Sequence, residues 1–268
     1  MLNVVARSLV TGVRMPPDSF ALDRKVALIT GGTRGIGKAI ALAFAGAGAS
    51  VVVTGRKPEG VTAAVAEIRA AGAEASGIAG NVSNVEDARA MVAHAVNTFG
   101  GLDILVNNAA VNPVFGPVEN TSTDAFDKIM AVNVRAPLEL AKLALPNFTA
   151  REGGNILNIS SIGGLSPEPS LGVYSISKAA LISLTQVLAR EWGRHNVRAN
   201  VICPGLIRTD FSSALWQNAK ILAHMMRSQA LPTLGEPGHI GGLALFLCSA
   251  AGAFCTGGVY VADGGYAI

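Results

Sequence analysis

Short apolar runs alternate with longer helix-like segments along almost the whole chain, and this alternation restricts the possible fold more than any other feature. Residues 26–29, 50–54 and 102–106 are apolar or β-branched runs of strand length, and an Ala-rich segment at 35–47 separates the first two. Strands that alternate with helices in this way build a parallel sheet through right-handed crossovers. The sequence therefore predicts an α/β fold, with a doubly wound, mostly parallel sheet of about seven strands and helices on both faces.

The pattern continues to the C-terminus without a linker, a repeat or a low-complexity stretch. Further strands are expected at residues 73–78, 155–160, 197–202 and 259–261. Further helices are expected at residues 62–71, 85–98, 125–135, 137–148, 174–194 and 236–248. A chain of 268 residues, half of them hydrophobic, can bury one large core. We predict a single domain over residues 22–268.

Residues 1–21 precede the first predicted strand and carry Arg7 and Arg14, with no acidic residue before Asp18. This composition permits a weak transit peptide, but the segment has no long apolar stretch and no clear cleavage site. A start at Met15, followed by two prolines, is another interpretation. We interpret residues 1–21 as a flexible N-terminal arm.

The bulk composition excludes several classes of function. The net charge is only +3, and no run of Lys and Arg is interleaved with aromatic residues, so we expect no nucleic-acid partner. No apolar stretch reaches the length of a membrane span, so we expect no membrane insertion. Cys203, Cys248 and Cys255 lack metal-ligand spacing, which favours free thiols in a reducing compartment and no metal site.

A glycine-rich segment, Thr-Gly-Gly-Thr-Arg-Gly-Ile-Gly at residues 30–37, directly follows the first predicted strand and begins a helix. Glycines there allow a tight turn and a close approach to a pyrophosphate, while the helix N-terminus offers free N–H groups to the anion. A plain strand-to-helix turn is the alternative. The position after a strand favours a dinucleotide-binding turn.

The second predicted strand ends without the acidic residue that would bind the ribose 2′-hydroxyl of NAD. Arg56 stands there instead, and Arg34 lies in the glycine-rich turn. Two guanidinium groups near the same ribose would suit a 2′-phosphate, which predicts NADP(H) as the cofactor. The alternative for Arg56 is a solvated surface charge.

Polar residues also follow two later strands. Asn107 and Asn108 end the strand at 102–106, and Ser160 and Ser161 end the strand at 155–160. Carboxyl ends of strands line the ligand crevice of a doubly wound sheet. The amides could tie strands together or touch the cofactor, and the hydroxyls could orient a carbonyl oxygen or bond a turn.

Tyr174 and Lys178 lie four residues apart in a predicted helix and therefore share one face. A free tyrosine titrates near about 10 and is a poor acid or base at neutral pH. We expect the ammonium group to favour the phenolate and to lower that pKa, which would make Tyr174 a usable proton donor and acceptor.

Taken together, these motifs resemble the short-chain dehydrogenase/reductase family from about residue 22 to the C-terminus. The matching patterns are Thr-Gly-x-x-x-Gly-x-Gly, Asn-Asn-Ala, the Ser-Ser strand end, Tyr-x-x-x-Lys and Pro-Gly at 204–205. The resemblance implies a single-domain Rossmann fold and a catalytic set of Asn133, Ser161, Tyr174 and Lys178. In that set Tyr174 donates the proton, Lys178 assists it and holds a ribose, Ser161 orients the carbonyl, and Asn133 bends a helix and holds a relay water.

The resemblance also implies binding residues for cofactor and substrate. Asn81 replaces the usual Asp, keeping an acceptor oxygen without the charge, and Ala110 replaces a glycine, so its backbone must avoid glycine-only angles. The implied cofactor-binding residues are Gly31, Thr33, Arg34, Gly35, Ile36, Gly37, Arg56, Asn81, Val82, Asn108, Ala109, Ala110, Tyr174, Lys178, Pro204, Gly205, Ile207 and Thr209. The substrate-binding residues expected are Phe115, Ser161, Gly163, Leu206, Phe211 and Trp216.

Within the family, the chain resembles the NADPH-dependent carbonyl reductases that include dicarbonyl and retinal reductases. It ends Tyr-Ala-Ile, without the peroxisomal tripeptide, so we expect a cytoplasmic enzyme. The expected activity is reversible reduction of a ketone to a secondary alcohol, on a small-molecule substrate, by a homotetramer. A 3-oxoacyl-thioester (acyl-carrier-protein) reductase shares every motif and is the first alternative. A non-catalytic scaffold that binds the cofactor is the second, although such chains usually lose Tyr, Lys or Ser.

Overall fold

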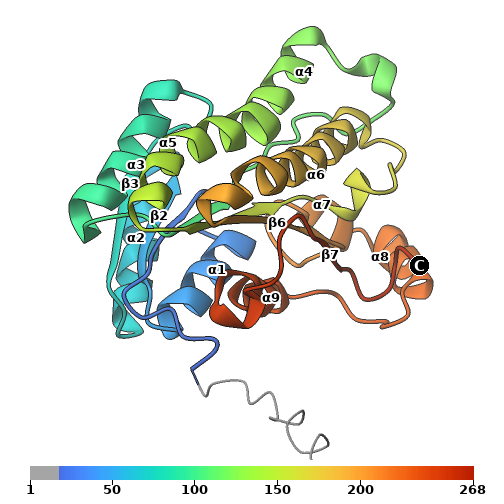
Figure 1. Cartoon of the computed structure of the whole chain (residues 1–268). Coiled ribbons are helices and arrows are strands. Elements are labelled where there is room, and N and C mark those ends of the chain that lie inside the picture. Colours follow the sequence, from blue (N-terminus) through green and yellow to red (C-terminus); the bar gives the residue numbers. More distant parts are fainter. Residues whose placement is uncertain (1–17) are drawn as a thin grey trace, which may run out of the picture.

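A parallel sheet lies at the centre of the fold in the structure, a computed structural model that describes residues 18–268. Its seven strands follow the order β3-β2-β1-β4-β5-β6-β7, and every neighbouring pair runs parallel (Figure 1). The strands are β1 (Val26–Ile29), β2 (Ser50–Gly55), β3 (Ala75–Ala79), β4 (Ile104–Asn107), β5 (Gly154–Ile159), β6 (Val197–Pro204) and β7 (Val259–Ala262). The predicted doubly wound α/β fold is confirmed.

Helices cover both faces of this sheet (Figure 1). One face carries α1 (Gly35–Gly46), α2 (Pro58–Ala70) and α9 (Pro237–Cys248). The other carries α3 (Val85–Phe99), α5 (Ala136–Ala150) and α6 (Gly172–Trp192). Side chains alternate along a strand, so Ala27 and Ile29 pack in the first layer and Val26 and Leu28 in the second. Each face of the sheet is therefore covered by its own core of buried apolar side chains.

Shorter helices lie around the carboxyl edge of the sheet and in its connections. These are α4 (Thr123–Met130), α7 (Ser213–Trp216), α8 (Ala219–Ser228), the π-helix Ala131–Arg135, and the 3-10 turns Val118–Asn120, Ile162–Gly164, Gly193–His195 and Ala250–Gly252. The segment 125–148 differs from the prediction of two separate helices. It is a continuous helical path in which a π-helix joins α4 directly to α5.

The predicted N-terminal arm falls mainly on residues 1–17, which lie outside the described residues. Its last four residues, 18–21, are described and contact the domain. Ser19 is buried and its carbonyl accepts a hydrogen bond from the N–H of Ala251 at 2.9 Å. The packed part of the chain therefore begins before residue 22.

The expectation that no apolar stretch reaches the length of a membrane span is wrong. Gly172–His195, which comprises α6 and the turn after it, is long and apolar enough to cross a membrane by length and composition alone. In the fold it packs against β6 and the π-helix, and 44% of its most apolar window is buried inside the protein. Its apolar character is accounted for by this packing.

Candidate active site

A cleft of about 730 Å³ opens along the carboxyl edge of the sheet. Its walls come from the ends of β1, β2, β4, β5 and β6 and from the segments that follow them. The strand order reverses between β1 and β4, and ligands of doubly wound sheets bind at such a reversal. The fold therefore brings most of the predicted site residues to one place.

The glycine-rich turn lies at the start of α1 and lines this cleft through Gly31, Thr33, Arg34, Gly35 and Ile36. Gly31 has a φ of 62°, and a Cβ on it would lie 2.9 Å from Nδ2 of Asn108. Glycine is therefore required for conformation and for space. The turn presents an unobstructed backbone beside a helix N-terminus, which fits the pyrophosphate of a dinucleotide.

Gly37 was predicted to bind the cofactor but is not among the residues that line the cleft. Gly37 is buried, and a Cβ there would collide with the carbonyl oxygen of Gly31. Its small size lets the first turn of α1 pack against the preceding loop. Gly37 therefore supports the shape of the turn without lining the cleft.

The two asparagines after β4 have different roles, an alternative that the sequence had left open. Asn107 is buried, and its Nδ2 donates to Oδ1 of Asn158 at 2.9 Å, which ties β4 to β5. Asn108 lines the cleft, and its Nδ2 donates to the carbonyls of Thr30 and Gly31 at 3.0 and 3.1 Å. Ala109 and Ala110 also line the cleft, and Ala110 has no positive φ, as predicted.

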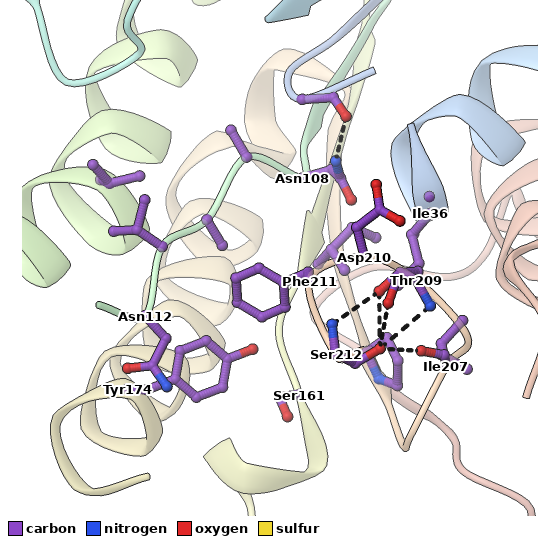
Figure 2. Close-up of a pocket in the computed structure, with 18 of the residues that line it drawn as sticks. Ile36, Asn108, Asn112, Ser161, Tyr174, Ile207, Thr209, Asp210, Phe211 and Ser212 are labelled. Carbon is purple, nitrogen blue, oxygen red and sulfur yellow. Dashed lines mark hydrogen bonds between the residues drawn. The ribbon is translucent and has the colours of Figure 1, made fainter. Parts of the chain in front are cut away.

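Tyr174 and Lys178, one turn apart on α6, both line the cleft (Figure 2 shows Tyr174 directed toward the segment that carries Ser161). The Lys178 ammonium is buried, donates to the carbonyl of Ile159 at 2.7 Å, and lies 5.5 Å from the centre of the Tyr174 ring. The Phe211 ring packs 6.1 Å from the same ring. Tyr174 is thus held between a fixed cation and an aromatic wall.

Ser161 lies beside Tyr174 at the end of β5. Its hydroxyl oxygen accepts a hydrogen bond from the N–H of Gly163 at 3.1 Å. A hydroxyl that accepts from the backbone keeps its own proton to donate, here toward the cleft. The neighbouring Ser160 is buried and donates to the carbonyl of Lys178 at 2.8 Å, so it anchors α6 instead.

The expected lowering of the Tyr174 pKa is wrong for this structure. Burial raises the pKa of Tyr174 to about 12, and the smaller effect of the Ser161 hydroxyl acts in the opposite direction. Burial also lowers the pKa of Lys178 to about 8, with a smaller opposing effect of Cys203. Desolvation disfavours the charged forms of both groups and is the largest cause of each shift. At neutral pH the phenol is a protonated donor.

Asn133 lies in the π-helix and is buried behind the cleft, outside its lining. Its side chain accepts from the N–H of Val111 at 2.9 Å and donates to the carbonyl of Val111 and to Ser177, both at 3.0 Å. Pro137 has no N–H, so the usual helical bond to the Asn133 carbonyl cannot form. The helix is therefore irregular at Asn133, where it takes the form of a π-helix.

Arg56, Asn81 and Val82 line the far end of the cleft, beyond β2 and β3. Oδ1 of Asn81 accepts from the N–H and the hydroxyl of Ser83 at 3.2 and 2.9 Å. The acceptor oxygen of Asn81, which was expected to bind the cofactor, is thus engaged within its own turn. Arg34 reaches across the cleft, where its Nη1 lies 3.3 Å from Oδ2 of Asp210.

The segment after β6 lines the near end of the cleft. The cofactor-binding residues expected there, Pro204, Gly205, Ile207 and Thr209, all line the cleft, together with Leu206. Gly205 is pressed against Asp263, since a Cβ would lie 2.7 Å from the Asp263 Cβ. Glycine at this position lets two loops meet.

The expected substrate residues Phe115, Ser161, Gly163, Leu206 and Phe211 line the cleft. Trp216 does not, because its indole N–H donates to the carbonyl of Thr209 at 2.9 Å and its ring packs 5.7 Å from the Arg208 guanidinium. Residues that the sequence had not identified as binding residues include Lys57, Lys128, Glu168, Leu171 and Asp210. They come from loops and a helix end whose approach depends on tertiary packing, and no motif marks them.

A family model described as enoyl-(acyl carrier protein) reductase matches residues 31–267. The chain is 44% identical to dehydrogenase/reductase SDR family member 4 of Sus scrofa over 246 residues, which cover 92% of this chain and 88% of the relative. A solved 7α-hydroxysteroid dehydrogenase in complex with NADH and 7-oxo glycochenodeoxycholic acid superposes with a TM-score of 0.91 at 33% identity, covering 94% of this chain and 98% of that one.

A gluconate 5-dehydrogenase from Burkholderia cenocepacia J2315, in complex with NADP and tartrate, has a TM-score of 0.89 at 31% identity, with 93% and 97% of the two chains covered. These relatives share the fold and span nearly their whole length with this chain. The match of the family model covers most of the sequence and includes the motifs discussed above from Gly31 onward. The chain belongs to the short-chain dehydrogenase/reductase family.

Proposed function

We propose that this oxidoreductase is an NADP(H)-dependent carbonyl reductase that interconverts ketones and secondary alcohols. The observation that carries the proposal is that Tyr174, Ser161 and buried Lys178 line the same cleft as the glycine-rich turn. A proton donor, a second hydroxyl and a dinucleotide-binding turn are the parts that carbonyl reduction requires.

The protein's own groups act on the carbonyl oxygen. NADP(H), when bound, would supply or accept the hydride. Ser161 donates a hydrogen bond to the oxygen as negative charge develops on it, and Tyr174 transfers its proton there. The raised pKa of Tyr174 keeps that proton in place at neutral pH, which suits the reductive direction. Lys178 and Asn133 serve to return a proton to Tyr174.

The preference for NADP(H) over NAD(H) rests on charge. Arg34 and Arg56 both line the cleft, and Lys57 adds a third cation next to Arg56. The strand end after β2 offers no carboxylate to a ribose hydroxyl. A 2′-phosphate is a strong acceptor that pairs well with guanidinium groups. We expect NADPH to bind more tightly than NADH.

The pocket beside Tyr174 favours an apolar ketone. Phe115, Leu171, Phe211, Leu215 and Met225 line it, and aromatic rings together with a methionine form an adaptable apolar surface.

We further propose that the enzyme is cytoplasmic and a homotetramer.

A 3-oxoacyl-thioester reductase is the second candidate. It is supported by the description of the matching family model, which names the acyl carrier protein. The two functions share the same proton donor and differ in what occupies the pocket. A non-catalytic scaffold is disfavoured because Ser161, Tyr174 and Lys178 are all present.

Purified protein assayed for NADPH oxidation with diketones, aromatic ketones and acetoacetyl thioesters tests these alternatives. We expect turnover of diketones or aromatic ketones, faster with NADPH than with NADH. A clear preference for thioesters would favour the second candidate. Tight NADPH binding with no turnover of any substrate would contradict both and favour a scaffold.

A further inference from the structure

An ion pair spans the cofactor end of the cleft. Nη1 of Arg34, in the glycine-rich turn, lies 3.3 Å from Oδ2 of Asp210, which is 176 positions away in the sequence. Both residues line the cleft, and Figure 2 labels Asp210 beside Ile36, at the start of α1. The pair therefore joins the phosphate-binding turn to the segment that forms the substrate wall.

Asp210 is held in position by its own loop. The Ser213 hydroxyl donates to the Asp210 carbonyl at 2.8 Å, and the Ser212 hydroxyl bonds to Thr209 and to the Ile207 carbonyl. The loop also leans directly on the glycine-rich turn, because a Cβ on Gly35 would lie 3.1 Å from Cγ2 of Thr209. This packing places the Asp210 carboxylate within reach of Arg34.

Asp210 pairs with the Arg34 guanidinium, which the proposed function requires at the 2′-phosphate of NADP(H). Arg34 is one of two guanidinium groups proposed to bind the 2′-phosphate of NADP(H), and this further inference rests on that proposal. A carboxylate and a phosphate both accept from the guanidinium fork and compete for its donors. NAD(H) carries a hydroxyl at the same position and makes no such demand on Arg34.

We propose that Asp210 is a selectivity residue, which restrains the preference for NADP(H) by competing with the 2′-phosphate for Arg34. Both side chains of the pair are largely exposed, at 68% and 75%. Exposed pairs contribute little because water and salt screen them, so the competition should change the cofactor ratio by no more than about fivefold. Because the 2′-phosphate carries more negative charge than a carboxylate, the phosphate still displaces Asp210.

The same pair could instead act as a clamp that closes over either cofactor. A clamp would stabilise bound NADPH and bound NADH to the same extent, so its loss would weaken both. Competition for Arg34 would change the dissociation constant of NADPH and leave that of NADH unchanged. The ratio of the two dissociation constants therefore separates the two roles, and it also cancels any general change in the charge of the cleft.

The test is a fluorescence titration of NADPH and NADH into the parental protein, Asp210→Asn, Arg34→Gln and the double variant, at low and high salt. We expect Asp210→Asn to tighten NADPH about two- to fivefold relative to NADH, with a smaller gain at high salt. In the Arg34→Gln background, Asp210→Asn should leave the ratio unchanged. Glu236→Gln is the matched control. It removes a carboxylate paired with Arg208 at 2.8 Å, outside the cleft lining, and should not alter the ratio.

Weaker binding of both cofactors by Asp210→Asn, or an unchanged ratio, would overturn the competition. These results leave the proposed NADP(H) preference intact if Arg34→Gln still weakens NADPH selectively. If Arg34→Gln and Arg56→Gln both leave the ratio unchanged, the proposed cofactor preference itself fails.

Discussion

At the scale of single residues, burial governs the electrostatics of Tyr174 and Lys178 in the cleft. The spacing of Tyr174 and Lys178 correctly placed both on one helix face toward the cleft. The direction of the Tyr174 pKa shift was wrong, because spacing reports proximity and not desolvation. Trp216 was misplaced for a related reason, since a sequence shows that a side chain is aromatic and not which way it points.

The raised pKa of Tyr174 predicts different pH dependences for the two directions of the reaction. Alcohol oxidation needs the phenolate as a base, and well below the pKa the phenolate fraction rises about tenfold per pH unit. The oxidation rate should therefore climb steadily from about pH 7 to about pH 9, while reduction, which uses the protonated phenol, should show no such rise. Initial rates in both directions, at saturating cofactor, check this. A plateau in oxidation at neutral pH would contradict the raised pKa.

At the scale of elements, most boundaries were predicted because caps and strand ends carry local signals. Asn84 accepts from the N–H groups of Glu86 and Asp87 at 2.9 and 3.1 Å and begins α3 where expected. The π-helix was not predicted. Its Asn133 side chain bonds to Val111, 22 positions away, and no local pattern reports such a tertiary contact. Pro137 was the local signal for this irregularity.

Replacing Pro137 should allow the π-helix at Ala131–Arg135 to adopt regular α-helical hydrogen bonding. Pro137→Ala supplies an N–H that can bond to the Asn133 carbonyl, which would occupy an acceptor of the residue that we propose helps to return protons to Tyr174. We expect a folded protein of similar or greater stability with a lower kcat, though by less than the roughly 10²–10⁴-fold loss from removing a general acid. Thermal unfolding and steady-state kinetics measure both effects.

Pro146→Ala is the control, because Pro146 lies in the same helix, α5, and its missing N–H concerns the Lys142 carbonyl and not that of Asn133. This variant should keep the parental kcat. Equal losses in both variants, or none in Pro137→Ala, would show that the Asn133 carbonyl plays no part in turnover.

At the scale of the whole molecule, the alternation of strands and helices was sufficient to predict a parallel sheet with two covered faces. The order of the strands did not follow from the alternation itself, because it depends on which crossovers pack together. Loop residues such as Glu168 and Asp210 reach the cleft only through that tertiary arrangement. The assembly of subunits is likewise invisible to periodicity, although exposed apolar residues indicate where to test it.

The proposed tetramer predicts a sensitive surface on α6. Ile176 and Val187 are 51% and 44% exposed, and their spacing places both on one face of the helix. Val187→Glu should convert the tetramer into smaller species, because it would bury an unpaired charge at the interface. Size-exclusion chromatography with light scattering measures the mass. Ala63→Glu, at an exposed position on α2, is the control and should leave the mass unchanged. A monomeric parental protein, or an unchanged Val187→Glu mass, would contradict the assignment.

The most direct test of the central claim is the turnover of Tyr174→Phe, which removes one hydroxyl and keeps the ring against Phe211. Tyr260→Phe, at a tyrosine on β7 outside the cleft lining, is the matched control. If Tyr174 donates the proton, its variant should lose about 10²–10⁴-fold in kcat while binding NADPH nearly as tightly as the parental protein. Tyr174→Phe turning over ketones at the parental rate would contradict the account.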